Sequence, residues 1–339
     1  MPEFCRHGRF LQNCRICNKP APKATSLSRS APTRTGTPSR PRSAASGVVV
    51  KRLARAVEDG YENELVPGLK ASGDARRLAE ELAFSVARLA ELAIDPPGLY
   101  AEAALAEDLE ESLWLAFLIA HLSPLTPDGS AGGGPSAAGP SAAGPSTAAA
   151  DPFATIRATR VPWATGEIPS LDEGAVLGPR TTVDPREPAR TVAAYRAWPA
   201  RHGGSQAAAL TGDDNWTAER RFQRIFERLS LPGFGRAGRF ELLVSLGRLG
   251  LIDVSPPDLQ LGEAGDQAVI AAKRVFGIGE RFLMERRAAD LAAEAGIPLD
   301  AFDLALFNFG QAEERRATMG SAVAPDADVR ERVEGALGL

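Results

Sequence analysis

Four side chains that commonly bind metal lie close together at the start of the chain: Cys5, His7, Cys14 and Cys17. Two cysteines separated by two residues chelate a metal ion, and structural Zn²⁺ takes four Cys or His ligands in a tetrahedron. We therefore expect a zinc knuckle over residues 1–19, with Zn as its cofactor and the metal as the source of its folding energy. Four protein ligands would leave no open position for catalysis. The alternative is a leader whose cysteines have no common role.

Two short turns, each with an apolar residue between two glycines, form a second candidate site. Glycine permits positive φ and close backbone approach, and the amides that open a following helix can bind a phosphate. Basic residues flank both turns. The residues predicted to bind nucleic acid are Gly233, Gly235, Arg236, Arg239, Gly277, Gly279 and Arg281. The alternative is that each turn only ends a helix, where glycine is also favoured.

Amphipathic helices are predicted to position these turns. Residues 73–93 carry leucine and valine at steps of three and four, and residues 99–122 continue the pattern after Pro96 and Pro97. A helix capped by Thr217 precedes the first turn. We expect an all-α fold, with His121 as a core or helix-terminal histidine.

Two low-complexity stretches divide the chain. Residues 20–46 are rich in Pro, Ser, Thr and Arg and predict a disordered basic linker, and residues 128–150 repeat the unit PSAAG. We expect a helical subdomain over 47–127, a helix-hairpin-helix domain over 151–312 and a helical tail over 313–339.

Charge is distributed unevenly along the chain. Residues 1–52 hold 11 Lys/Arg and one acidic residue, a net charge of +10, whereas the rest holds 28 Lys/Arg and 42 Asp/Glu, a net charge of −14. A basic arm attracts phosphate-rich partners such as DNA. The start of the chain has no apolar signal-peptide core, and the apolar run 113–122 is about half of a membrane span. We therefore expect a cytoplasmic protein with reduced thiols and no membrane partner.

The helix, Gly-apolar-Gly turn and helix around Leu231-Pro-Gly-Phe-Gly235 resemble the helix-hairpin-helix DNA glycosylases. In that superfamily a hairpin grips the DNA backbone, and an aspartate about twenty residues further on serves the flipped base. The resemblance assigns that role to Asp253. Bifunctional members carry a lysine where this chain has Ala237, which argues against a Schiff-base lyase reaction.

A second resemblance covers residues 213–310. The stretch "KRVFGIGERFLMERRAADLAAEAG", followed by "FDLALFNFG", is similar to the divergent bacterial clade of the alpha-glutamyl/putrescinyl thymine pyrophosphorylases. The matching features are Lys273-Arg274, Gly277, Gly279, Phe282-Leu283, Asp290-Leu291 and Gly310.

This second resemblance implies a reaction on modified thymine in DNA. Pyrophosphate on the 5-methyl group would be expelled by an amine donor, with Lys273 and Arg274 holding the leaving group and Asp290 taking the proton of the amine. Asp290 could instead pair with Arg286 or Arg287 on the helix surface. Asp253 and Asp303 are the alternative acids, and Asp300 is expected to cap a helix.

Three classes of function remain open from the sequence. The first is an enzyme acting on a DNA base, either a pyrophosphorylase or a monofunctional glycosylase. The second is a DNA-binding module without catalysis, and the third is an all-α protein-interaction scaffold. DNA binding that weakens steeply with salt would separate the first two classes from the third.

Overall fold

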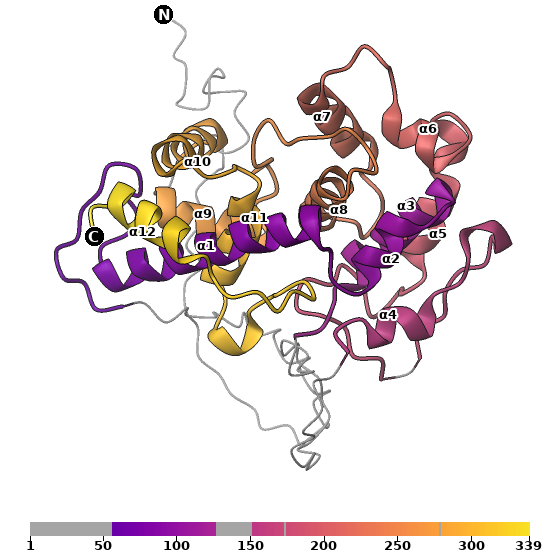
Figure 1. The fold of residues 1–339 in the computed structure, drawn as a ribbon, viewed down its shortest axis with the longest axis horizontal. Helices are drawn as coiled ribbons and strands as arrows, with labels where there is room; N and C mark the ends of the chain where they lie inside the picture. Colours follow the sequence, from indigo (N-terminus) through magenta and orange to yellow (C-terminus); the bar gives the residue numbers. More distant parts are fainter. Residues whose placement is uncertain (1–55, 127–150, 173, 278) are drawn as a thin grey trace, which may run out of the picture. The chain divides into compact units, whose positions relative to one another are not determined.

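The computed structural model describes residues 56–126, 151–172, 174–277 and 279–339, and its regular elements are helices (Figure 1). The first six are α1 (Ser72–Ile94), α2 (Leu99–Leu105), α3 (Leu109–Leu122), α4 (Ala154–Thr159), α5 (Arg190–Ala197) and α6 (Gln206–Thr211). The next six are α7 (Ala218–Arg228), α8 (Arg236–Arg248), α9 (Gln267–Phe276), α10 (Arg281–Ala295), α11 (Ala301–Phe309) and α12 (Ala327–Ala336). Short 3₁₀ turns occur at Trp163–Thr165, Pro199–Arg201 and Glu313–Arg315. No strand occurs within the described ranges, which confirms the all-α prediction for them.

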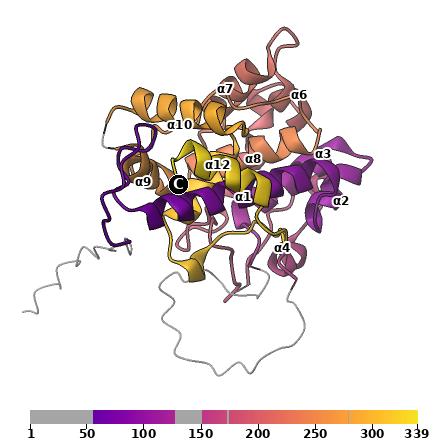
Figure 2. The ribbon, with the colours of Figure 1, turned by 60° about the vertical axis from the view of Figure 1, so that its left-hand side comes forward.

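Helix α1 packs with the last helices of the chain. It contacts α11 and α12, while α9 contacts α10 and α11, and α10 also contacts α12. Figures 1 and 2 show α1, in indigo, lying beside these orange and yellow helices in both views. This group of helices is therefore built from segments at the two ends of the described sequence.

Helix α3 is the centre of a second group, formed by the middle of the chain. It packs against α2, α6 and α8, and α7 packs against α6 and α8. The α3 helix is apolar nearly all round, and its residues from Ser112 to Leu122 are buried. A helix that is apolar on every side is typical of a core position.

One hydrophobic core joins the two groups. It runs from Val66 to Leu337 and includes residues from α1, α3, α8, α9 and α11, and α1 contacts α8 directly. Helices before and after residues 128–150 therefore bury their apolar faces together. The boundary predicted there from composition separates two stretches of sequence whose helices share this core.

Local sequence signals explain several helix ends. The Thr217 side chain accepts a hydrogen bond from the Arg220 amide at 3.2 Å, as the predicted N-cap requires. The Asp266 carboxylate caps α9 through the amides of Ala268 and Val269. Asp300 stands at the N-cap position of α11, but its carboxylate binds the Arg248 guanidinium and makes no cap hydrogen bond.

Helix α1 is buried on more sides than its leucine stripe indicates. The leucines Leu78, Leu82, Leu89 and Leu92 are buried as predicted. Glu81 and Arg88, from the face predicted to be polar, are buried as well. The reason is that α8, α11 and α12 all pack on this one helix. Among the described helices, none is both long and apolar enough to cross a membrane.

Candidate functional site

The first glycine turn, residues 231–235, joins α7 to α8 and is anchored by Phe234. Leu231 and Phe234 form an isolated β-bridge, and the Phe234 ring is buried against Phe117 at a centroid distance of 5.3 Å. Gly233 has φ +78°, and a Cβ atom there would lie 2.4 Å from the Thr191 hydroxyl oxygen. Both the positive φ and this close approach explain the glycine.

The amide that opens α8 is occupied by a carboxylate of the same chain. The Arg236 amide donates to Glu263 Oε2 at 3.0 Å, and the Arg239 guanidinium pairs with the other oxygen of Glu263. An anion at a helix N-terminus is stabilised by the unpaired amides and by the helix dipole. Glu263 thus supplies the negative charge that the sequence prediction assigned to a DNA phosphate.

The two arginines of the first turn lie inside the fold. The Arg236 guanidinium is buried and binds Asp303 at 2.6 Å, Asp266 at 3.3 Å and the Leu259 carbonyl at 2.6 Å. The Arg239 guanidinium donates to the Phe226 carbonyl, with its carbon 4.2 Å from the centre of the Phe226 ring. In sequence, an arginine that follows a turn looks the same whether its side chain points outward or inward.

The second glycine turn, between α9 and α10, is more open. Gly277 has φ +84°, Gly279 is exposed, and the N-cap residue Glu280 makes no side-chain cap. The Phe282 side chain, directly after the first residue of α10, is 69% exposed, and Leu283 is 44% exposed. Ile278 lies outside the described residues.

Arg281 is the exposed cation of this second turn. Its Nε donates to Glu285 Oε1 at 2.8 Å, one helical turn away, and Nη2 lies 3.5 Å from Asp258 Oδ1. The Arg281 side chain is 45% exposed, whereas Asp258 is 33% and Glu285 is 12% exposed. The solvent at the arginine screens both pairs and makes each of them weak.

The three predicted catalytic residues lie on α9 and α10, and two of them pair with other side chains. Arg274 binds Asp74 of α1 at 2.7 Å and lies 4.8 Å from the centre of the Phe309 ring. Asp290 is 55% exposed on α10 and pairs with Arg286 at 3.8 Å. Lys273 is partly buried and makes no ion pair within the described ranges. The surface pairing that the sequence offered as an alternative for Asp290 is therefore present.

The alternative acids also have arginine partners. Asp253 is exposed, and its carboxylate and its carbonyl both accept from the buried Arg221, at 2.9 and 2.6 Å. Asp303 is buried on α11 between Arg180 and Arg236, each at 2.6 Å. Each of these carboxylates holds elements of the fold together.

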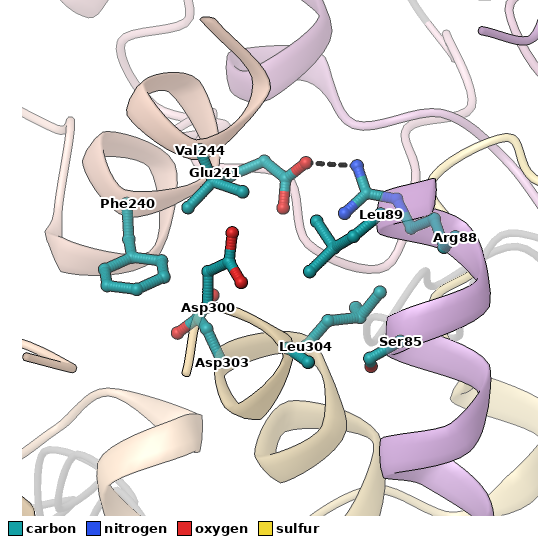
Figure 3. A pocket seen from close by; sticks show the side chains of 10 residues that line it. Ser85, Arg88, Leu89, Phe240, Glu241, Val244, Asp300, Asp303 and Leu304 are labelled. Carbon is teal, nitrogen blue, oxygen red and sulfur yellow. Dashed lines mark hydrogen bonds and ion pairs between the residues drawn. The ribbon is translucent and has the colours of Figure 1, made fainter. Parts of the chain in front are cut away.

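Asp303 belongs to a buried chain of ion pairs that the sequence prediction missed. The chain runs through Arg88, Glu241, Arg180, Asp303, Arg236 and Asp266. It connects α1, α8 and α11 with the loop around Arg180. Figure 3 shows Glu241 and Arg88 paired above Asp303. A charged residue inside an apolar run, as in "RFELLVSL" around Glu241, is the one sequence signal of such a buried pair.

The pairing decides the protonation of this buried chain. Burial alone would raise the pKa of the Asp303 carboxyl, but the charges of Arg236 and Arg180 and their hydrogen bonds hold it below its usual value. Burial likewise acts to lower the pKa of Arg180, and Asp303 and Glu241 raise it above its ordinary value. Asp303 and Arg180 are thus held in their charged forms by the partners that face them.

The small cavity beside this network has little room for a ligand. Its volume is about 10 Å³, which suits a single water molecule. Ser85 Oγ and Arg88 Nε, on residues that line it, have no hydrogen-bond partner among the described atoms (Figure 3). We therefore assign the network to stability.

The predicted metal ligands Cys5, His7, Cys14 and Cys17 lie outside the described residues. Within the described ranges, no group of three or more His, Cys, Asp or Glu side chains is arranged to hold a metal ion. His121 is buried at the end of α3, as predicted, with Nδ1 2.6 Å from the Thr182 hydroxyl and its ring stacked on Phe117.

No family model matches this chain, and neither a curated protein nor a solved structure matches it.

Proposed function

We propose that the protein binds DNA through a helix-hairpin-helix element, and that the turn between α9 and α10 contacts the phosphate backbone. The observation that carries this proposal is the difference between the two helix starts. The first amide of α8 is bonded to Glu263, whereas α10 begins without a side-chain cap and exposes Arg281, Phe282 and Leu283.

The chemistry at the start of α10 suits a phosphate. Amides in the first turn of a helix lack partners within the helix and carry partial positive charge. Arg281 adds a full charge in the same turn, and its 45% exposed side chain can turn from Asp258 and Glu285 to a phosphate. Phe282 offers an exposed ring that can pack against sugars or bases.

The predicted zinc knuckle and basic linker fit the same proposal. Residues 1–52 carry a net charge of +10, which would attract DNA without regard to sequence. The remaining residues carry −14, which disfavours a broad contact surface. We therefore propose a local contact at the second turn, helped by the basic arm and its zinc-bound knuckle.

A salt series with the full-length protein tests this proposal. Fluorescence anisotropy would measure binding to duplex and single-stranded DNA between low and physiological salt. We expect affinity to fall with salt, and Arg281→Ala and Lys273→Ala each to weaken binding about tenfold. Arg330→Ala, an exposed arginine of α12 without an ion pair in the described ranges, is the matched control. Absence of binding at low salt would favour the scaffold function.

A base-directed reaction is a second candidate, favoured by the exposure of Asp290 on the same helix that begins at the proposed contact. The resemblance to the thymine pyrophosphorylases supplies the reaction: an amine displaces pyrophosphate from a modified thymine. Lys273 would hold the leaving group more readily than Arg274, because Arg274 is bound to Asp74.

Asp290→Asn separates this candidate from a binding module. We expect the variant to lose turnover of DNA that carries 5-pyrophosphorylated methyl pyrimidines and to keep its affinity for DNA. If the wild-type protein binds this DNA but never releases pyrophosphate, the chain is a binding module only.

A further inference from the structure

An open pocket lies between the turn Pro199–Arg201, α6, the loop that precedes α7 and the last residue of α7, Arg228. It uses no residue of either glycine turn. Its volume is about 540 Å³, within the range of small-molecule sites. The residues that line it are Arg201, His202, Gly203, Ala208, Gly212, Asp213, Trp216 and Arg228.

Two arginines and one carboxylate line this pocket, and no ion pair joins them. Most arginines in the described ranges form an ion pair or donate a hydrogen bond to a carbonyl oxygen, as Arg221 and Arg274 do. Arg201 and Arg228 form no ion pair within those ranges. The one acidic lining residue is Asp213, whose carboxylate accepts from the amide and the side chain of Asn215. Two exposed guanidinium groups are therefore available to an anion.

His202 lies close enough to sense both arginines. Burial, Arg228 and Arg201 each lower the pKa of its imidazole below the ordinary value. The ring is therefore neutral at pH 7 and can donate or accept a hydrogen bond. The buried Trp198 ring, 5.4 Å away between centroids, helps to hold it in place.

Trp216 gives the pocket an aromatic wall. Its ring is half-buried, and the Arg228 guanidinium carbon lies 5.0 Å from the ring centre. Gly212 has φ +67°, and a Cβ atom there would lie 2.4 Å from the Trp216 ring. Glycine at this position therefore allows the ring to lie against the backbone.

We propose that this pocket binds a nucleotide, with the nucleobase beside Trp216 and the phosphate between Arg201 and Arg228. A purely apolar ligand would leave two guanidinium groups without a counter-ion, and a bare inorganic anion would make no use of the ring. The proposal is independent of DNA binding at the second turn, because it uses none of residues 276–281. A free nucleotide and one nucleotide of a single strand share this chemistry.

Calorimetry with the full-length protein tests the proposal. The probes are thymidine monophosphate, adenosine monophosphate, inorganic phosphate and a five-nucleotide single-stranded DNA. We expect saturable binding of at least one mononucleotide, at least tenfold tighter than inorganic phosphate. A five-mer that binds more tightly than either mononucleotide, with a gain that Arg201→Ala removes and Arg281→Ala keeps, would identify a strand as the source. A five-mer whose binding does not depend on Arg201 would identify a free nucleotide.

Variants of the lining residues locate the ligand. Arg201→Ala and Arg228→Ala should each weaken nucleotide binding about tenfold, and Trp216→Leu should abolish the preference for nucleotide over inorganic phosphate. Asp213→Asn keeps the oxygen that accepts from Asn215 and should strengthen binding severalfold. Arg220→Ala, an exposed arginine of α7 outside the pocket, should leave affinity unchanged.

Three results would overturn the proposal. These are absence of saturable binding by all nucleotide probes, wild-type affinity in both arginine variants, and an unchanged nucleotide preference in folded Trp216→Leu. Circular dichroism establishes folding for each variant, and the exposed Arg201 and Arg228 provide the test should Trp216→Leu not fold. Arg281→Ala should not change mononucleotide affinity, so loss of DNA binding at the second turn would be seen separately.

Discussion

The two glycine turns are similar in sequence and different in their surroundings. At the first turn, Glu263 binds the opening amide of α8 while Arg236 reaches inward to Asp303. At the second turn, α10 starts without a side-chain cap and Arg281 stays exposed. A Gly-apolar-Gly turn with a nearby arginine thus serves internal packing in one place and leaves its side chains exposed in the other.

The largest expected change in stability comes from replacing the buried arginine of the first turn, and the exposed arginine of the second turn is its control. Arg236→Met removes one of two arginine partners of the buried Asp303, and should lower the free energy of unfolding by about 3–5 kcal/mol. Arg281→Met should change it by less than about 0.5 kcal/mol. Urea denaturation of both variants measures the difference. Equal midpoints would contradict the distinction between the two turns.

Low pH should lower the free energy of unfolding through His121, which packs beside the first turn. His121 lies against Phe234, and burial lowers its pKa from 6.5 to about 4 in the folded protein. As pH falls, the unfolded state binds the proton first, so stability present above pH 6.5 is lost between pH 6.5 and 4. The expected loss from this group at pH 4 is about 3 kcal/mol.

Comparison with His121→Gln isolates this contribution from the carboxylates that titrate in the same range. Unfolding free energies of both proteins should be measured from pH 7 to pH 4. The wild type should lose about 3 kcal/mol more than the variant over that interval. Parallel pH profiles would show that His121 is already accessible to protons in the folded state.

The proposed DNA contact predicts an intermediate change, in DNA affinity, when Arg281 of the second turn is replaced. Arg281→Ala should weaken DNA binding about tenfold and lower the slope of log affinity against log salt by about one. Anisotropy titrations at several salt concentrations give both quantities. A variant with the wild-type slope would show that Arg281 makes no phosphate contact.

Removing the carboxylate that binds the first amide of α8 should change DNA affinity by a smaller factor. Glu263→Gln removes the negative charge beside the α8 amide and Arg239, so a phosphate could approach there. We expect DNA affinity to rise severalfold, with a stability loss of about 1 kcal/mol at most because the Glu263 side chain is 46% exposed. Glu227→Gln, an exposed acid of α7, is the control. An equal gain in the control would mean that only net charge matters.

The smallest effect is expected at Asp290. Its contact with Arg286 is 3.8 Å long and exposed, so Asp290→Asn should change the free energy of unfolding by less than about 0.5 kcal/mol. Thermal or urea unfolding measures this. A loss above 1 kcal/mol would place Asp290 in a structural role and weaken its use as a test of catalysis.

Some of the structure could be predicted from local patterns. The apolar side of α7 and its cap at Thr217 depend on residues close in sequence, so helical periodicity and the capping residue indicated them. The direction of Arg236 could not be predicted, because its partner Asp303 is 67 residues away. The carboxylate that binds the first amide of α8 could not be predicted either, because Glu263 lies 27 residues after that amide in the sequence.

Helical periodicity and charge are local properties, so the amino-acid sequence was enough to predict the helical class of the described part, the two glycine turns and the uneven charge of the chain. Which arginines are buried and which are exposed depends on the folded arrangement of distant segments. That arrangement also brings Arg201, Trp216 and Arg228 to one pocket. The physical reason is that burying a guanidinium requires carboxylates and carbonyls from distant segments to converge on it, and that convergence exists only in the folded chain.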